Sequence, residues 1–217
     1  MRKQEDQSQN GFKSILKSYR KYRLKKYGTI LSEILAYYGD LSDIHGKRIL
    51  ELGPGRHLNL LRFFKNETNA KIVFGVGKSF IWPWMKSEYR SLVHDSYILN
   101  FLKSQGSKKY DLIYSRYVME EHSIDPIILL RSKIYWRYLK ENRLANPDRY
   151  FPSSIPNMQA IFAEAYKHLS PGGILISEIA KMKNSALDDA FLEAFHWRSL
   201  KKRKIGRLSQ VVSGVKR

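Results

Sequence analysis

Hydrophobic residues form several short, nearly continuous runs from Lys47 onward, and stretches with helical periodicity separate these runs. Such runs are typical of the central strands of a parallel sheet that helices cover on both faces. The sequence therefore predicts an α/β fold, doubly wound, with a mainly parallel sheet. The expected strands cover residues 49–52, 72–76, 91–94, 112–114 and 174–179.

Two helices and a hairpin complete this predicted sheet. A helix is expected over residues 58–64, and a longer helical stripe over residues 158–169 stops at the Ser-Pro-Gly-Gly turn of residues 170–173. Residues 197–205 and 208–215 have the pattern of two strands. They predict a C-terminal antiparallel hairpin, which brings the sheet to seven strands.

The first 45 residues are predicted to form a basic, helical N-terminal extension to a domain that covers residues 46–217. Thr29 is expected to cap a helix that ends near Gly39. A preceding amphipathic stripe could lie on a membrane or on RNA, although most such stripes pack on their own domain. The apolar residues of this stripe are Phe12, Ile15, Leu16, Tyr19 and Tyr22.

The composition limits the classes of function. A net charge of +19, from 39 Lys and Arg against 20 Asp and Glu, would attract nucleic acid, anionic lipid or another polyanion, chiefly through the basic ends 13–26 and 198–207. A solvated surface is an equally good explanation. The absence of cysteine excludes disulfides and thiolate metal sites, and no apolar run approaches the roughly 20 residues of a membrane span. We expect no metal site and a cytoplasmic protein.

Residues 48–55 are the most informative stretch, because a short apolar strand ends there in a carboxylate, Glu51, and a glycine turn. A glycine turn at the carboxyl end of a parallel strand lets a ligand lie against bare backbone. The carboxylate beside it can hold a positively charged or hydroxylated group. The stretch therefore predicts a cofactor pocket.

Four segments in a fixed order extend this prediction. With them the chain resembles a class I S-adenosylmethionine-dependent methyltransferase from about residue 46 to the C terminus. Glycine turns after strands are common, so the order of the segments carries the resemblance rather than any one of them. It implies a Rossmann-like fold, S-adenosylmethionine as cofactor and a methyl acceptor that the sequence does not identify. The segments are residues 49–55, 72–76, 111–120 and 165–175.

The resemblance also implies roles for individual residues. The two glycines of the turn would approach the methionine part of the cofactor, and Glu51 would lie near its amino group or organise the turn. Asp95 matches the usual position of an adenine contact, and Ser115 with Arg116 would line the floor near the methyl group. A helix-capping role for Glu51 and a structural role for Ser115 remain open. The implied cofactor-binding residues are Glu51, Gly53, Gly55, Asp95, Ser115 and Arg116.

One position departs from the family pattern. The family usually carries an acidic residue at the end of the second strand, where it accepts hydrogen bonds from both ribose hydroxyls, but this sequence has Gly77. Each lost bond to a charged acceptor could weaken binding by about 1.5 to 3 kcal/mol unless another group substitutes. An aspartate at position 77 should therefore tighten cofactor binding, unless another residue already fills this role.

The candidate catalytic residues follow the fourth strand. His122 can act as a base near neutral pH and Glu121 can orient it, although solvated acids at the start of a helix explain this segment as well. Residues 127–157 are predicted to be an insertion that mixes basic and aromatic side chains. Such a mixture suits either a substrate lid or the charged face of an ordinary helix.

Two other functions fit part of the pattern. A nicotinamide-dependent oxidoreductase would share the strand and the turn, but it expects Gly-x-Gly-x-x-Gly, which residues 53–58 do not provide. A catalytically silent protein that keeps the sheet and holds RNA or another polyanion by its basic ends fits both the charge and Gly77.

Overall fold

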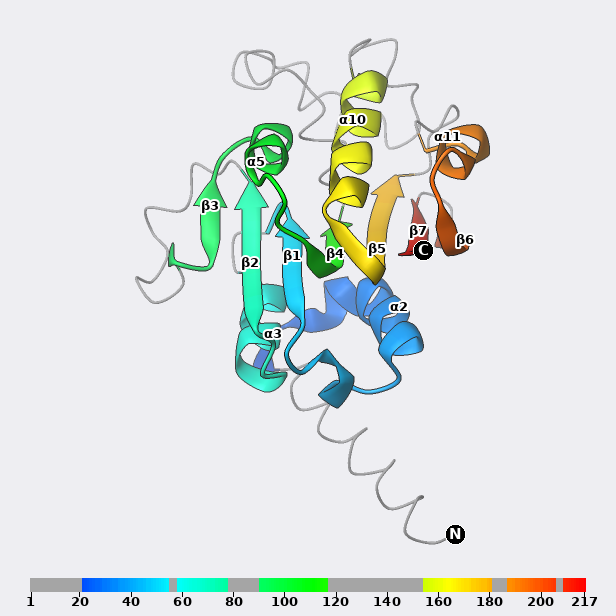
Figure 1. Ribbon diagram of the computed structural model, residues 1–217. Coiled ribbons are helices and arrows are strands. Elements are labelled where there is room, and N and C mark those ends of the chain that lie inside the picture. Colours follow the sequence, from blue (N-terminus) through cyan, green and yellow to red (C-terminus); the bar gives the residue numbers. More distant parts are fainter. Residues whose placement is uncertain (1–20, 55–57, 78–89, 117–153, 181–186, 206–208) are drawn as a thin grey trace, which may run out of the picture.

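A central sheet with helices on both faces organises the molecule (Figure 1). The computed structural model describes residues 21–54, 58–77, 90–116, 154–180, 187–205 and 209–217. The strands are β1 Arg48–Leu52, β2 Ile72–Gly77, β3 Val93–Asp95, β4 Tyr110–Arg116, β5 Leu169–Ala180, β6 Trp197–Ile205 and β7 Ser209–Lys216. The helices are η1 Leu24–Tyr27, α2 Gly28–Tyr38, η2 Ser42–Ile44, α3 Asn59–Glu67, α5 Ile98–Ser104, α10 Ser154–Lys167 and α11 Asp189–Glu193.

The sheet of the described residues has seven strands in the order β3-β2-β1-β4-β5-β7-β6. Strands β1 to β5 pair in parallel, and β7 pairs antiparallel with both β5 and β6. This arrangement confirms the predicted doubly wound sheet and its antiparallel C-terminal hairpin. Because the chain order reverses between β1 and β4, the carboxyl ends of these two strands flank the place where such sheets bind ligands.

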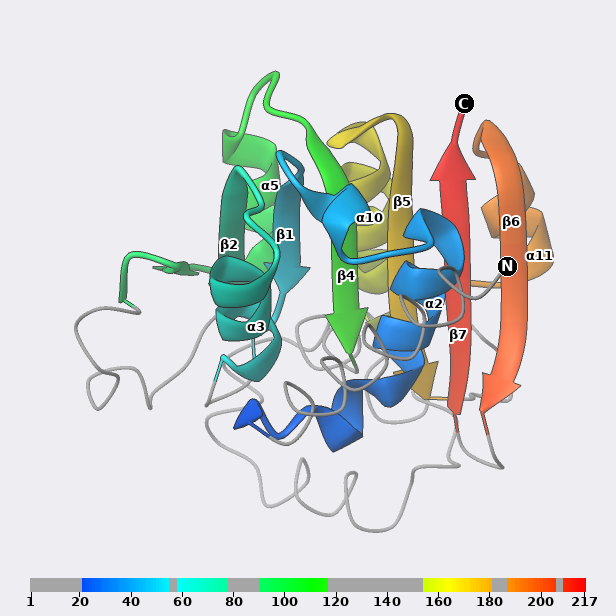
Figure 2. The same cartoon turned by 90° about the horizontal axis from the view of Figure 1, so that it is seen from below.

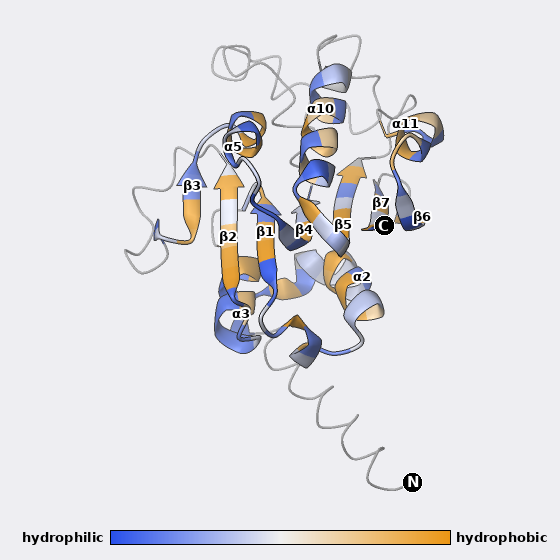
Figure 3. Cartoon of the chain, viewed as in Figure 1, coloured by the Kyte–Doolittle hydropathy of each residue, from blue (hydrophilic) through white to orange (hydrophobic). Residues whose placement is uncertain are grey.

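Each face of the sheet carries its own hydrophobic cluster. Helices α5 and α10 cover one face, while α2 and α3 cover the other (Figure 2). The strands between them are largely apolar (Figure 3), and Ile49, Leu50 and Leu52 of β1 have no exposed surface. Burial on both faces explains why these strands appear in the sequence as continuous apolar runs rather than alternating ones.

The described part of the N-terminal extension packs into the core. Tyr22 and Ile44 are both buried in the cluster that also contains Ile49 and Phe64. The Tyr22 hydroxyl donates a hydrogen bond of 2.7 Å to Glu67 of α3. The division at residue 45 stays a prediction, but residues 22 to 44 cover one face of the sheet. None of the described helices has the length and apolar character needed to cross a membrane.

Several predicted boundaries differ from the structure. Thr29 does not cap a helix, because α2 begins at Gly28 and its N-cap is Tyr27; the predicted end at Gly39 is confirmed, with a φ of 81°. Helix α10 ends at Lys167, and residues 170–173 form a bulge inside β5. The bulge forms because Tyr110 pairs with residue 169 whereas Leu112 pairs with residue 174, and Gly172 takes the left-handed φ of 71° that this requires.

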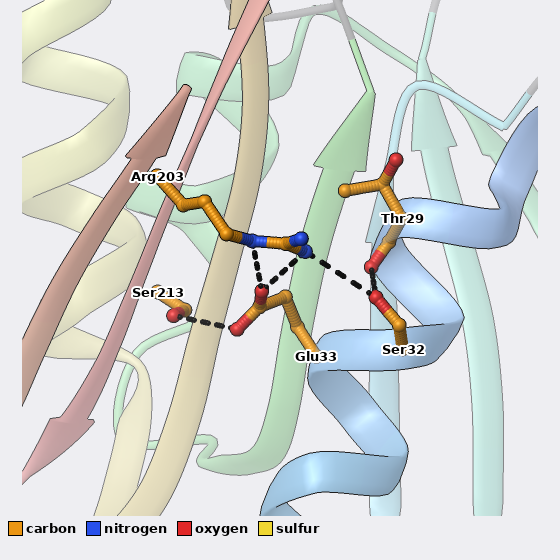
Figure 4. A network of polar contacts seen from close by, with 5 residues as sticks. All are labelled: Thr29, Ser32, Glu33, Arg203 and Ser213. Carbon is orange, nitrogen blue, oxygen red and sulfur yellow. Dashed lines mark hydrogen bonds and ion pairs between the residues drawn. The ribbon is translucent and has the colours of Figure 1, made fainter. Parts of the chain in front are cut away.

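An ion pair ties α2 to the C-terminal hairpin (Figure 4). The guanidinium of Arg203 on β6 donates two hydrogen bonds, of 3.1 and 2.7 Å, to one carboxylate oxygen of Glu33. The Ser213 hydroxyl on β7 donates to the other oxygen at 3.2 Å. The Glu33 side chain is only 14% exposed, so these donors replace most of the water that it would otherwise bind.

Replacing Glu33 by alanine should lower the free energy of unfolding by about 1 to 3 kcal/mol, because charge-assisted bonds are lost from a largely buried carboxylate. Urea denaturation measures this change. Asp189→Ala is the matched control: it removes the partner of Lys202 on the same strand, but Asp189 is 80% exposed, so the cost should stay below about 1 kcal/mol. Equal costs for the two variants would contradict the proposed difference.

Candidate functional site

The turn after β1 lies directly against β2. Gly53 has a φ of 73°, and its N–H donates a 2.7 Å hydrogen bond to the carbonyl of Val76. A Cβ atom on Gly75 would come within 2.8 Å of Pro54 Cγ and 2.6 Å of Leu61 Cδ1. Only a glycine at position 75 therefore lets the turn and α3 pack this closely on the sheet.

Gly77 occupies the end of β2 beside the same turn. A Cβ atom there would lie 3.3 Å from the Cα of Gly53, which is tight but requires a shift of only a few tenths of an ångström. Gly77 also pairs with Asp95, the last residue of β3. The Asp95 carboxylate is exposed. It thus lies one strand away from position 77, where the family usually carries an acidic residue.

Glu51 lies near the end of β1, where only 3% of its surface is exposed. The phenol of Tyr114, which is opposite it on β4, donates a 3.0 Å hydrogen bond to Glu51 Oε2. Burial raises the pKa of Tyr114 well above its usual value, and the neighbouring Glu51 carboxylate raises it further. The phenol therefore stays protonated and continues to donate to the carboxylate.

Tyr27 approaches the same carboxylate from the N-terminal segment. It is 3% exposed, and burial together with Glu51 raises its pKa above the usual range. The guanidinium of Arg116 lies 5.9 Å from the centre of the Tyr27 ring. Tyr27, which is not part of the sheet, thus lies close to Glu51 near the end of β1 and to Arg116 at the end of β4.

The ends of β4 and β5 add two polar pairs. The hydroxyls of Ser115 and Ser177 are 2.9 Å apart and buried. Arg116 Nε donates a 3.1 Å hydrogen bond to Glu178, whose side chain is 5% exposed. Because Ser115 and Arg116 are consecutive on a strand, these pairs lie on opposite faces of the sheet.

The structure brings some of the predicted site residues together. Glu51, Ser115 and Arg116 lie at the ends of the neighbouring strands β1 and β4, and Gly53 follows directly. Asp95 lies on the other side, two strands from β1. The predicted residues Gly55, Glu121 and His122 and the insertion at 127–157, except for its last four residues at the start of α10, lie outside the described residues.

Sequence reasoning missed Tyr27, Tyr114 and Glu178. For Glu178 a signal existed, since it is a carboxylate near the end of the apolar run of β5, as Glu51 is in that of β1. Tyr114 instead resembled an ordinary strand residue, and Tyr27 lies in a basic stretch with no strand pattern. Within the described ranges, no group of three or more His, Asp or Glu side chains could hold a metal ion.

Comparisons with solved structures show which known proteins share this fold. The chain has the fold of the class I S-adenosylmethionine-dependent methyltransferases. A methyltransferase from Archaeoglobus fulgidus matches 91% of the chain and 97% of its own length, with a TM-score of 0.56 and 14% identity. The N-methyltransferase NodS from Bradyrhizobium japonicum WM9, in complex with S-adenosylhomocysteine, matches 92% and 98%, with a TM-score of 0.52 and 12% identity.

An RNA-modifying enzyme is also among the similar structures. The T. thermophilus 16S rRNA methyltransferase RsmC, in complex with AdoMet and guanosine, matches 86% of this chain with a TM-score of 0.50 and 18% identity. The match covers 42% of RsmC. No family model and no curated protein matches the chain in sequence. At these identities the structural matches show a shared fold alone, and the substrates belong to the individual proteins.

The buried tyrosines predict a loss of stability in alkali. A tyrosine whose pKa is raised in the folded state contributes stability that is present below the unfolded pKa of about 10 and is lost as the pH rises above it. Tyr114→Phe should make this loss shallower by up to about 1.4 kcal/mol per pH unit. Urea denaturation between neutral pH and strong alkali measures both slopes, and equal slopes would contradict the role of Tyr114.

Proposed function

We propose that this protein transfers a methyl group from S-adenosylmethionine to an acceptor. The observation that carries the proposal is a glycine cradle at the carboxyl end of β1, formed by residues 53, 75 and 77. It lies in a sheet with the methyltransferase strand order. Gly75 and Gly77 are buried and let the turn at Gly53 lie against β2, where a Cβ atom at position 75 or 77 would crowd it. When bound, S-adenosylmethionine supplies an electrophilic methyl group on a sulfonium.

The charges at this end of the sheet support a cationic ligand. Glu51 and Glu178 contribute two carboxylates and Arg116 one guanidinium, while the phenols of Tyr27 and Tyr114 stay neutral. The cluster therefore carries one net negative charge in a poorly solvated place, where electrostatic interactions are strong. Glu51 would hold the ammonium of the methionine part, and Arg116 would line the floor near the methyl group.

Ser115 contributes in a different way. The residue is 1% exposed and its hydroxyl shares a hydrogen bond with Ser177, so we assign it to the alignment of β4 with β5 beneath the methyl group. Gly53 and Gly55 would approach the methionine backbone. Methyl transfer is an in-line displacement, so orientation and desolvation of the acceptor contribute much of the rate. For an acceptor that must lose a proton, we assign His122 as base and Glu121 as its orienting group.

Asp95 would replace the missing ribose acceptor at position 77. It is next to Gly77 in the β2–β3 register, and Gly77 lies beside the glycine turn. A carboxylate one strand away can accept from a ribose hydroxyl or from the adenine amino group, which explains how a glycine is compatible with binding.

Calorimetry with S-adenosylhomocysteine tests the proposed function. We expect saturable binding with one site per chain, since the product retains the adenosine and methionine parts that the cradle would hold. Glu51→Gln should weaken binding, and the exposed-site variant Lys103→Glu on α5 should leave it unchanged. No heat of binding at millimolar ligand would refute a cofactor site at the end of β1.

Asp95→Asn should weaken S-adenosylhomocysteine binding by about tenfold or more, because a hydrogen bond to a charged acceptor is lost. Gly77→Asp should not tighten binding in the native background, since it would oppose Asp95 on the next strand and crowd Gly53. Gly77→Ala is the control that isolates the crowding. Tighter binding by Gly77→Asp than by the native protein would show that the ribose contact is missing and that Asp95 does not supply it.

A further inference from the structure

Strand β6 forms one edge of the sheet and pairs only with β7 among the described strands. The described hairpin residues, 197–205 and 209–217, include no Asp or Glu. An open strand edge presents unpaired backbone groups, and basic side chains on it repel other strands. The edge cations of β6 are Arg198, Lys201, Lys202, Arg203 and Lys204.

Two of these cations are engaged within the fold. Arg203 pairs with Glu33 of α2 on one face, and Lys202 pairs with Asp189 of α11 on the other. The remaining three, Arg198, Lys201 and Lys204, are exposed and form no ion pair with a described carboxylate. Side chains on β6 alternate between the two faces of the sheet: Lys201 lies on the α2 face with Arg203, and Lys204 lies on the opposite face with Lys202, so these cations border both sides of the exposed edge.

A small hollow of about 100 Å³ lies between α2 and the hairpin, beside Lys201. Tyr37 of α2 is 37% exposed at this hollow, and its hydroxyl donates a hydrogen bond to the carbonyl of Gly172. The rings of Tyr37 and Tyr38 meet edge to face, with 4.8 Å between their centres. Ser199 lines the hollow as well. The hollow thus combines a fixed aromatic ring, a cation, hydroxyls and the Glu33 carboxylate, whose charge Arg203 already pairs.

We propose that β6 and the adjoining hollow bind single-stranded nucleic acid. Its phosphates would contact Arg198, Lys201 and Lys204 along the edge, and one base would stack on Tyr37. Sites for single strands combine these two features, a positively charged track and an aromatic ring on which bases stack. Charges that only protect an edge from aggregation would not require an exposed tyrosine anchored beside them.

The direction of β6 connects this surface to the proposed cofactor site. Strand β6 is antiparallel to β7, as β5 is, so β6 runs toward the same end of the sheet as β4 and β5 (Figure 2). Three strand spacings, or about 14 Å, separate its end at Lys204 from the end of β4. The bound strand is therefore the methyl acceptor, an assignment that rests on the proposed methyltransferase function.

Fluorescence anisotropy with a labelled, mixed-sequence single-stranded RNA of twelve nucleotides tests the surface. The double variant Lys201→Glu and Lys204→Glu should weaken binding at least tenfold, and its salt slope should fall by about 1.4, as two phosphate contacts are lost. The control Lys65→Glu and Lys103→Glu changes the net charge equally on α3 and α5, away from the hairpin. It should lose markedly less affinity.

A second pair of variants tests the stacking. Tyr37→Leu should weaken RNA binding about fivefold or more, whereas Tyr37→Phe, which also loses the hydroxyl but keeps the ring, should bind like the native protein. Equal losses of RNA affinity for the β6 double variant and its control would refute the proposed binding surface. Equally tight binding of poly-glutamate would overturn the assignment to nucleic acid. Calorimetry with S-adenosylhomocysteine on the same variants separates these failures from a failure of the cofactor proposal.

Discussion

The close approach of the turn after β1 to strand β2 is the constraint on which the site depends. Because Gly75 has no side chain, Pro54 and Leu61 pack directly on β2, and the Gly53 N–H donates a 2.7 Å hydrogen bond to the Val76 carbonyl. Packed interiors do not absorb an extra methyl group without displacement, so a side chain at position 75 would push the turn and α3 away from the sheet. The glycines of β2 are therefore as much a part of the cradle as those of the turn itself.

Beside this cradle, polar groups are buried only where partners hold them. Glu51 accepts a hydrogen bond from the Tyr114 hydroxyl, and Glu178 accepts one from the Arg116 guanidinium. An isolated buried carboxylate would be costly, and breaking such a pair leaves one charge without compensation. Tyr27 completes the group from the N-terminal segment. The extension thus belongs to the architecture of the site, and the tie between Glu33 and Arg203 holds the helix that follows Tyr27 in place.

The strands of the sheet could be predicted from the sequence, whereas the contacts between side chains far apart in the chain could not. Doubly buried strands require apolar runs, so β1, β2 and β5 were recognisable, and two strand-like segments joined around Gly206 predicted the hairpin to within one residue at each end. Tyr114 and Glu51 are 63 positions apart, and only the parallel register brings them together. The cap of α2 was mispredicted because Thr29 has the right chemistry, but the preceding turn η1 leads into the helix two residues earlier, with Tyr27 as the N-cap.

The opposite charges of the two proposed surfaces suit a polyanionic acceptor. The cluster around Glu51 carries one net negative charge, which attracts a cationic methyl donor and repels phosphates. The cations of β6 lie three strand spacings, or about 14 Å, from β4, and two spacings from Glu178 on β5. A strand held along β6 would thus keep its phosphates away from the cofactor end.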